Sequence, residues 1–206
     1  WAFHYMANVF NHKATKDDFL TFKKINHQHW EAFQQNKLTK SEVLSERFVN
    51  YFKHHQMEVD GHRADVLFRN GLAEAKVKYF DQTLETIVEL SKRHNLYIVT
   101  NGVTETQKRR LNQTPLHKYI KKIFISEETG YQKPNPEFFN YVFNDIGEDE
   151  RQHSIIVGDS LTSDILGGIN AGIATCWFNF RGFDHNPGII PDYEINSWKQ
   201  LNDIVR

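Results

Sequence analysis

"VGDSLTSDILGGINAG", residues 157–172, decides the fold class, because a buried strand here turns directly into a helix. The apolar run stops at Gly158, Asp159 follows at once, and Asp164 comes five residues later. One acid at such a turn can cap the helix or face its dipole, which is worth about 0.5–2 kcal/mol. Ser160 and the hydroxyl residues after it can already cap the helix. The second carboxylate therefore indicates another task.

Short continuous apolar runs alternate with helical patterns along the whole second part of the chain. The predicted strands cover 96–100, 122–126, 154–158 and 174–179, with a short one near 193–195. The predicted helices cover 81–94, 105–111, 135–146, 164–171 and 198–205. This alternation is typical of a parallel sheet covered by helices on both faces. We therefore expect an α/β core over residues 79–206, in which the four longer strands form one Rossmann-like parallel sheet.

The first part of the chain, residues 1–78, has helical periodicity and no strand pattern. The spacing predicts helices over 16–34, from 39 to about 55, and over 61–75. The second of these begins with Thr39 and has Glu42 three residues later, which is the pattern of a capping box. We expect residues 1–78 to form a helical part distinct from the α/β core.

The composition excludes several classes of protein. With 25 basic and 26 acidic side chains the net charge is −1, which gives no electrostatic attraction for nucleic acid or an anionic membrane. No apolar stretch approaches the roughly 20 residues that span a bilayer. The single cysteine, Cys176, excludes an internal disulfide, so we expect a reducing, cytoplasmic location. No two of the 11 histidines are spaced as in a metal-ligand motif, and we interpret them as surface residues.

Polar residues follow three of the predicted elements at the edge where parallel strands end. Thr100, Asn101 and Gly102 close one strand, Lys133 lies in the loop after the next, and Asp159 closes the third. Ligands of such sheets bind outside the carboxyl ends of the strands. A hydroxyl with backbone N–H groups can hold phosphate oxygens, and a lysine neutralises their charge. Paired carboxylates suit Mg²⁺, so the set predicts a phosphoryl-transfer site.

Each of these features also has a purely structural interpretation. The sequence Thr-Asn-Gly is a common turn, a lone Lys133 is most often a surface residue, and Asp164 could be an ordinary acid in the first turn of a helix. Their occurrence in order, each at a strand end, favours the functional interpretation.

"VGDSLTSD", residues 157–164, resembles the fourth motif, GDxxxxD, of the haloacid dehalogenase superfamily of Mg²⁺-dependent phosphohydrolases. "GYQKPNP" matches the third-motif lysine at Lys133, and "VTNG" matches the second motif at Thr100. The resemblance covers residues 79–180. "INHQHWEAF" and "SERF" are similar to the helical cap of the pyrimidine-nucleotide 5′-nucleotidase-like branch. In that family the cap is inserted after the first motif and closes over the site.

The resemblance implies a role for each matching residue on the phosphate side. Thr100 would hydrogen-bond the transferred phosphoryl group, and the segment of Asn101 and Gly102 would add backbone donors. Lys133 would bridge the phosphate and the carboxylate of the nucleophile.

On the metal side, the resemblance implies that Asp159 ligates Mg²⁺, directly or through water. Asp164 would hold the loop and Lys133 in place, with Ser160 supporting the same turn. The implied substrate is a small phosphorylated metabolite or nucleotide, while nucleic acid and membranes are not expected partners and the oligomeric state stays open.

The family's nucleophile is the first Asp of a DxDxT/V motif, which ends the first strand ahead of the cap. "WAFHYMANVF", residues 1–10, contains no Asp, and the cap-like pattern begins almost at once. We therefore expect the central strand, with the nucleophile and the general acid/base, to precede Trp1. Residues 1–206 alone are expected to have little or no phosphatase activity.

Three functions are thus left open by the sequence. The leading one is a Mg²⁺-dependent phosphohydrolase of small phosphoesters, above all nucleoside 5′-monophosphates, that works through an aspartyl-phosphate. A 2-haloacid dehalogenase, which needs no metal, is the enzymatic alternative, and a catalytically silent binding protein is the other. The two acids Asp159 and Asp164 favour metal and phosphate.

Overall fold

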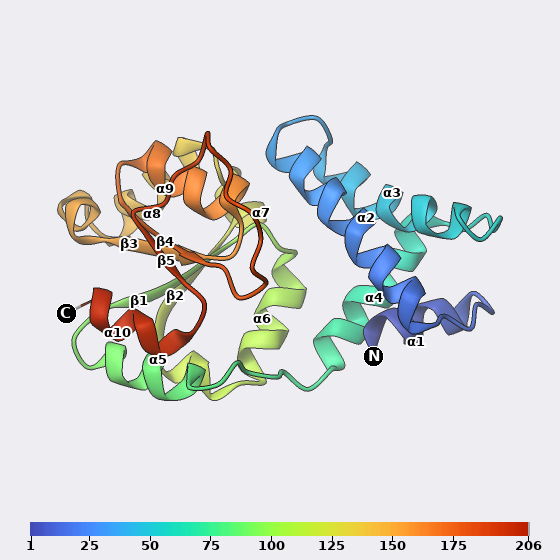
Figure 1. Ribbon diagram of the computed structural model, residues 1–206, viewed down its shortest axis with the longest axis horizontal. Helices are drawn as coiled ribbons and strands as arrows, with labels where there is room; N and C mark the ends of the chain where they lie inside the picture. Colours follow the sequence, from blue (N-terminus) through green and yellow to red (C-terminus); the bar gives the residue numbers. More distant parts are fainter. Residues whose placement is uncertain (206) are drawn as a thin grey trace. The chain divides into compact units, whose positions relative to one another are not determined.

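The computed structural model describes residues 1–205 and divides into two compact units, Trp1–Lys76 (unit 1) and Val77–Arg206 (unit 2). Within unit 1 every regular element is a helix, whereas unit 2 combines helices with parallel strands (Figure 1). The predicted α/β fold class is therefore confirmed. None of the helices within residues 1–205 combines the length and the apolar character that crossing a membrane requires.

Unit 1 consists of four helices: α1 (Ala2–Val9), α2 (Lys16–Gln34), α3 (Lys40–Lys53) and α4 (Gly61–Glu74). The predicted capping box at Thr39 is present, with Glu42 as the reciprocal partner. A second box, of Thr15 and Asp18, starts α2. Helix α1 was not predicted, because its short apolar stretch carries neither a capping residue nor enough turns for a clear period.

Aromatic side chains fill the core of unit 1. Each of the four helices contributes residues to one buried cluster, which contains Phe3, Met6, Phe22, Ile25, Phe48, Tyr51, Phe52 and Ala64. Several of its rings stack or meet edge to face, as in the pair of Phe3 with Phe22 at 5.0 Å between centroids. Unit 1 thus has a hydrophobic core of its own.

Unit 2 alternates helices and strands over most of its length. Its helices are α5 (Thr83–Ser91), α6 (Thr104–Asn112), α7 (Ser126–Thr129), α8 (Pro136–Ile146), α9 (Leu166–Ala171) and α10 (Leu201–Ile204). Its strands are β1 (Leu96–Thr100), β2 (Ile120–Ile125), β3 (Ile155–Gly158), β4 (Ala174–Phe178) and β5 (Tyr193–Ile195). Short turns of helix complete it: η1 (Pro115–Lys118), η2 (Glu148–His153), the π-helical turn η3 (Leu161–Ile165) and η4 (Trp198–Gln200). The strands lie between α5 and α10 on one face and α8 and α9 on the other (Figure 1).

The strands form two hydrogen-bonded sheets. One is the parallel pair β1-β2, and the other has the order β3-β4-β5, also parallel. The prediction that strands 96–100, 122–126, 154–158 and 174–179 form one sheet is therefore wrong. The physical reason is that β1 and β3 are not paired with each other, so that no ladder of hydrogen bonds joins the two sheets among the described residues.

A groove of about 980 Å³ lies between the facing edges of the two sheets. Every residue of β1 and every residue of β3 lines it, together with apolar side chains of α5, α8 and the carboxyl-terminal segment. Thr100, Lys133, Asp159 and Asp164 line the same groove. The open edges of two parallel sheets thus face one cavity that also contains the polar residues singled out from the sequence.

The two faces of these sheets have separate apolar cores. The face under α8 buries Phe124, Phe138 and their neighbours, and the face under α5 and α10 buries Cys176 with Leu90. At Gly168 of α9 an added Cβ would lie 2.6 Å from a methyl group of Ile156, so only glycine allows α9 to pack this closely on the sheet.

Candidate active site

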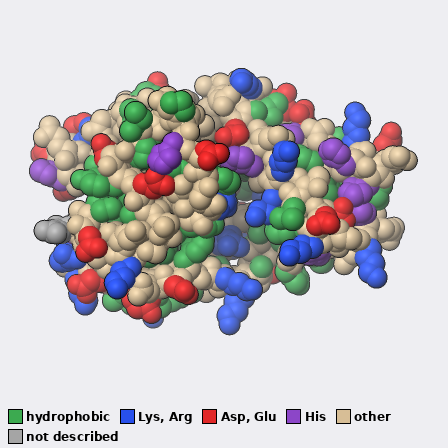
Figure 2. Space-filling view, in the orientation of Figure 1, with side chains coloured by type: hydrophobic (Ala, Val, Ile, Leu, Met, Phe, Trp, Pro, Cys, Tyr) green, Lys and Arg blue, Asp and Glu red, His purple; other side chains and the backbone are tan. Residues whose placement is uncertain are grey.

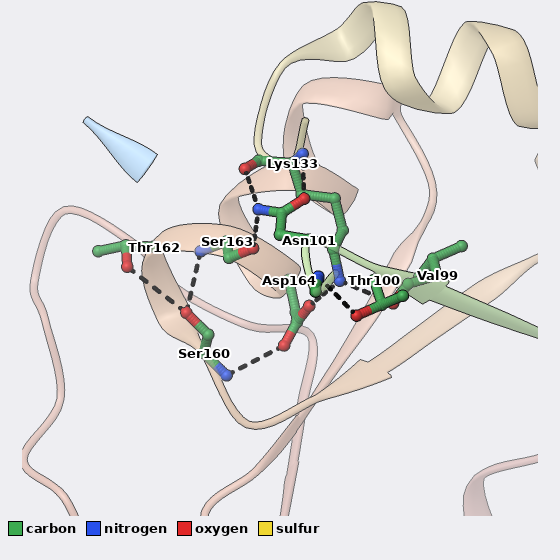
Figure 3. Close-up of polar contacts among 9 residues, drawn as sticks. Val99, Thr100, Asn101, Lys133, Ser160, Thr162, Ser163 and Asp164 are labelled. Carbon is green, nitrogen blue, oxygen red and sulfur yellow. Dashed lines mark hydrogen bonds and ion pairs between the residues drawn. The ribbon is translucent and has the colours of Figure 1, made fainter. Parts of the chain in front are cut away.

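The turn after β1 is organised by its own polar groups. The N–H of Gly102 donates to Oγ1 of Thr100 at 3.0 Å, which folds the backbone back over the strand end. The side chain of Asn101 is buried and points toward the loop that contains Lys133 (Figure 3). The Thr-Asn-Gly segment is therefore a turn, as its structural interpretation required, and it also forms part of a larger polar cluster.

Asn101 and the backbone of Lys133 exchange two hydrogen bonds. Nδ2 of Asn101 donates to the carbonyl oxygen of Lys133 at 2.8 Å, and the N–H of Lys133 donates to Oδ1 of Asn101 at 2.9 Å. The same Nδ2 also lies 3.4 Å from Oγ of Ser163. These bonds fix the loop after α7 to the carboxyl end of β1.

The ammonium group of Lys133 is held inside the cluster. Nζ donates to Oδ1 of Asp164 at 2.6 Å and to the carbonyl oxygen of Val99 at 3.0 Å (Figure 3). Lys133 and Asp164 are only 5% and 8% exposed, so this is a buried, charge-assisted pair. It bridges the end of β1 to the turn that follows β3, across the open edges of the two sheets.

The turn after β3 closes around Asp164. Oδ2 of Asp164 accepts a hydrogen bond from the N–H of Ser160 at 3.1 Å, and Oγ of Ser160 caps η3 by accepting from the N–H of Ser163 at 3.2 Å. A Cβ added at Gly158 would overlap the carboxylate of Asp164. Glycine at that position therefore allows the carboxylate to approach the strand end, and Asp164 has both oxygens engaged.

Asp159 differs from Asp164 because its side chain is half exposed and bound less tightly. Its carbonyl oxygen accepts from the indole N–H of Trp177 at 3.1 Å, and its carboxylate faces Arg181 at 3.7 Å. Burial and then the neighbouring Asp164 carboxylate raise the pKa of Asp159, while Arg181 and Lys133 oppose that rise. A cation beside two such carboxylates would relieve their repulsion.

The predicted residues therefore fall into two groups. Asn101, Lys133, Ser160 and Asp164 are joined by direct hydrogen bonds and an ion pair, with Thr100 at the edge of that network (Figure 3). The carboxylate of Asp159 instead faces Arg181. All the same, Thr100, Lys133 and both acids line one groove.

Several contributors to this site were not predicted from the sequence. The backbone carbonyl of Val99 and the hydroxyl of Ser163 receive hydrogen bonds that only the folded turn makes possible. Arg181 lies shortly after the carboxyl end of β4, and the other site residues were predicted because they follow strands in the same way. The same rule applied to the fourth strand could have found it.

The sequence matches the family model described as Haloacid dehalogenase-like hydrolase over residues 2–178. The HAD-hydrolase YfnB of Bacillus subtilis is 42% identical over 195 residues, which cover 95% of this chain and 83% of YfnB. A crystal structure of YfnB bound to magnesium has a TM-score of 0.93 and 40% identity to this chain. It covers all of this chain, which in turn covers 90% of that one.

Two further relatives are named for an activity. The pyrimidine 5′-nucleotidase YjjG of Escherichia coli is 31% identical over 93% of this chain and 84% of its own length. The pyrimidine 5′-nucleotidase PynA of Streptococcus pneumoniae is 33% identical over 94% of this chain and 80% of its own. Coverage of this extent includes residues of both units.

Proposed function

The chain belongs to the haloacid dehalogenase-like hydrolases, and from that premise we propose that it is a Mg²⁺-dependent phosphohydrolase of small phosphoesters. The observation that carries the proposal is the buried Lys133–Asp164 pair, which joins the carboxyl ends of β1 and β3 beside the half-exposed Asp159. The ammonium group of Lys133 and the hydrogen-bond donors around it suit a phosphoryl group, because phosphoryl transfer depends on positioning and charge neutralisation.

The phosphate contacts come from the turn after β1 and from Lys133. The hydroxyl of Thr100 and the backbone of Asn101 and Gly102 form the segment that would receive the phosphoryl oxygens, and the N–H of Gly102 would exchange its bond to Oγ1 of Thr100 for one to phosphate. Lys133 would balance their charge and that of the attacking carboxylate. Asp164 and Ser160 would act by holding the lysine and the turn in place, since both already bond within the cluster.

The donors at Asp159 fit Mg²⁺. This ion prefers oxygen ligands and is usually held by one or two carboxylates, substrate phosphate and several waters. Asp159 offers a half-exposed carboxylate whose pKa is raised by partial burial and then by the nearby negative charge of Asp164. When bound there, Mg²⁺ would neutralise charge on the phosphate.

We propose that the nucleophile is an Asp carboxylate on a strand that occupies the groove between β1 and β3, and that it forms an aspartyl-phosphate. Two open parallel edges and a cavity lined by every residue of both strands support this placement. A strand inserted there would pair with both edges and end beside Lys133. None of the described residues occupies that position.

Residues 1–78 are proposed to serve as the cap of this enzyme and residues 79–206 as its core. The proposed substrates are nucleoside 5′-monophosphates, because the relatives YjjG and PynA are named as pyrimidine 5′-nucleotidases and the similarity to both extends through unit 1. A reducing, cytoplasmic location suits the single buried thiol.

The test is hydrolysis of pyrimidine and purine nucleoside monophosphates, with and without Mg²⁺, by the complete gene product and by residues 1–206 alone. We expect phosphate release that depends on Mg²⁺ in the complete product, and little or none from residues 1–206. Halide release from 2-haloacids without metal would instead favour the dehalogenase. Nucleotide binding without turnover in the complete product would favour the silent binding protein.

A further inference from the structure

Three side chains of types that can ligate a metal meet within unit 1, whereas the candidate active site belongs to unit 2. His12, Asp18 and His55 each offer a ligand atom, and these atoms all lie within 4.8 Å of one another. Nε2 of His55 is 3.2 Å from Oδ1 of Asp18, and Nε2 of His12 is 3.9 Å from Oδ2. The two imidazole rings are 4.3 Å apart between centroids. This compactness was not visible in the sequence, where the residues have no ligand-motif spacing.

The cluster forms where three helices of unit 1 end or begin. His12 follows α1, Asp18 lies in the first turn of α2, and His55 follows α3. Next to the two histidines, Asn11 and Gln56 adopt left-handed backbone conformations with φ of 57° and 55°. Such conformations are unfavourable for non-glycine residues, and here they let the chain reverse direction beside each imidazole. Figure 2 shows that histidine side chains reach the surface over unit 1.

We propose that His12, Asp18 and His55 form a binding site for a transition-metal ion of the Zn²⁺ class. Zn²⁺ binds imidazole nitrogen and carboxylate oxygen at about 2.0–2.2 Å, often with three protein ligands and one water. Ligands at these lengths around a tetrahedral ion lie about 3.3 Å apart. Nε2 of His55 and Oδ1 of Asp18 are already 3.2 Å apart, whereas Nε2 of His12 is 3.9 Å from the other oxygen of Asp18 and has to move toward the ion.

The capping box that starts α2 holds the carboxylate of Asp18 in place. Thr15 engages Oδ2 of Asp18 in the capping box, while Oδ1 faces His55.

A buried phenol occupies the nitrogen of one proposed ligand while no ion is bound. The hydroxyl of Tyr51 lies 2.9 Å from Nε2 of His12, and its ring is fully buried in the core of unit 1. A metal on that nitrogen exchanges this hydrogen bond for a coordination bond, while the ring stays positioned by its contacts with Tyr51 and Phe52. The ion joins the segments after α1 and α3 to the start of α2, and so stabilises unit 1.

The experiment is a Zn²⁺ titration of chelator-treated protein by calorimetry, in the presence of excess Mg²⁺. Mg²⁺ prefers oxygen ligands, so it occupies carboxylate sites such as that of Asp159 and leaves imidazoles free. We expect one Zn²⁺ per chain. His12→Ala and His55→Ala should each weaken binding at least about tenfold. His54→Ala is the matched control, since His54 is the exposed neighbour of His55, and it should bind as the unsubstituted protein does.

A second measurement separates metal binding from a merely structural role. Saturating Zn²⁺ should raise Tm in the unsubstituted protein and in His54→Ala but not in His55→Ala, because only an ion bound to the folded state stabilises it. Asp18→Asn keeps an oxygen that can accept from the N–H of Thr15 in the capping box and should still weaken Zn²⁺ binding, with the helix content by circular dichroism unchanged. Unaltered Zn²⁺ affinity in these three ligand variants, equal loss in His54→Ala, or a Kd above about 100 µM would overturn the proposal. None of these readouts depends on hydrolase activity.

Discussion

At the scale of single residues, Lys133 is tied to two functions at once, because its ammonium group neutralises Asp164 and lies beside the proposed phosphate site. In the complete gene product, Lys133→Ala should remove about 2–4 kcal/mol of transition-state stabilisation, and kcat should fall accordingly. It should also destabilise the fold by about 3–5 kcal/mol, since it leaves a buried carboxylate unpaired. Steady-state kinetics and urea unfolding measure the two effects.

Lys122 supplies the matched control for that substitution. It pairs with Asp145 in an exposed ion pair, and pairs of this kind contribute little to stability. Lys122→Ala should therefore leave kcat unchanged and alter stability little. Equal effects of the two substitutions would show that Lys133 has no special place in the site.

Asp159 should determine the response to Mg²⁺. Asp159→Asn removes the proposed metal-binding charge and should raise the Mg²⁺ concentration for half-maximal activity by about tenfold or more. Because the pKa of Asp159 is raised, its carboxylate takes up a proton at a higher pH than an ordinary Asp, and Mg²⁺ activation should fall as pH drops through that raised value. Mg²⁺ titrations of activity across a pH series measure this, and an unaltered Mg²⁺ response in Asp159→Asn would contradict the role.

Gly158 should be irreplaceable for a steric reason. An alanine Cβ there would overlap the carboxylate of Asp164, so Gly158→Ala should displace that side chain and weaken its bond to Lys133. We expect a loss of about 1–3 kcal/mol of stability, the usual cost of overpacking, together with impaired turnover. Gly188→Ala is the control, because its nearest neighbour would be a side-chain oxygen of Asn186 at 3.4 Å. Urea unfolding of both variants decides the point, and a Gly158→Ala variant as stable as the control would be inconsistent with this packing.

At the scale of secondary-structure elements, the sequence predicted the strands of unit 2 well. β1 begins and ends as expected, and β3 and β4 differ from the prediction by one residue at an end. Continuous apolar runs bounded by polar turns are strong local signals. The helix expected over 164–171 instead begins with the π-helical turn η3, because Ser160 caps the turn and Asp164 is pulled back toward the strand.

The pairing of those strands into sheets could not be predicted from local sequence patterns. Pairing of β1 with β3 depends on what lies between them, which no local pattern in either strand records. For the site, strand-end positions identified Lys133 and both acids, whereas the hydrogen bond of Lys133 to the Val99 carbonyl follows only from the open edge of β1.

The junction of α1, α2 and α3 should respond to pH. Burial lowers the pKa of His12 from its ordinary value of 6.5, so the unfolded chain takes up this proton first as pH falls. The free energy of unfolding should therefore decrease as pH drops below 6.5, and more steeply than in His12→Gln. The lowered pKa of Asp18 acts in a lower range, where its stabilising charge is lost only as pH falls further. Urea unfolding in chelator at pH 7.5 and 5.5 tests this, and equal pH dependence in both proteins would exclude His12 as the cause.

At the scale of the whole molecule, the chain has two units with separate cores, and acidic and basic side chains are interspersed on the face shown in Figure 2. In unit 2, one edge of β1 and one edge of β3 face the groove without a paired strand among the described residues. In residues 1–206 alone, backbone amides of β1 and β3 should exchange with deuterium faster than those of β4, which is paired on both sides. Hydrogen-exchange mass spectrometry measures this difference. Equal protection of the three strands would mean that the open edges are closed by other contacts.

Cys176, buried in β4, can report how often the three-stranded sheet opens. Its thiol is the only one in the chain, and burial raises its pKa to about 11, so that both inaccessibility and protonation suppress its reaction. A thiol reagent can therefore modify it only when the three-stranded sheet opens. The rate of labelling then measures how often that opening occurs. Any ligand that stabilises the folded core, whether a nucleotide, a metal or an inserted strand, would slow the labelling of Cys176. Slower labelling would therefore reveal that a ligand binds before the ligand's chemistry is known.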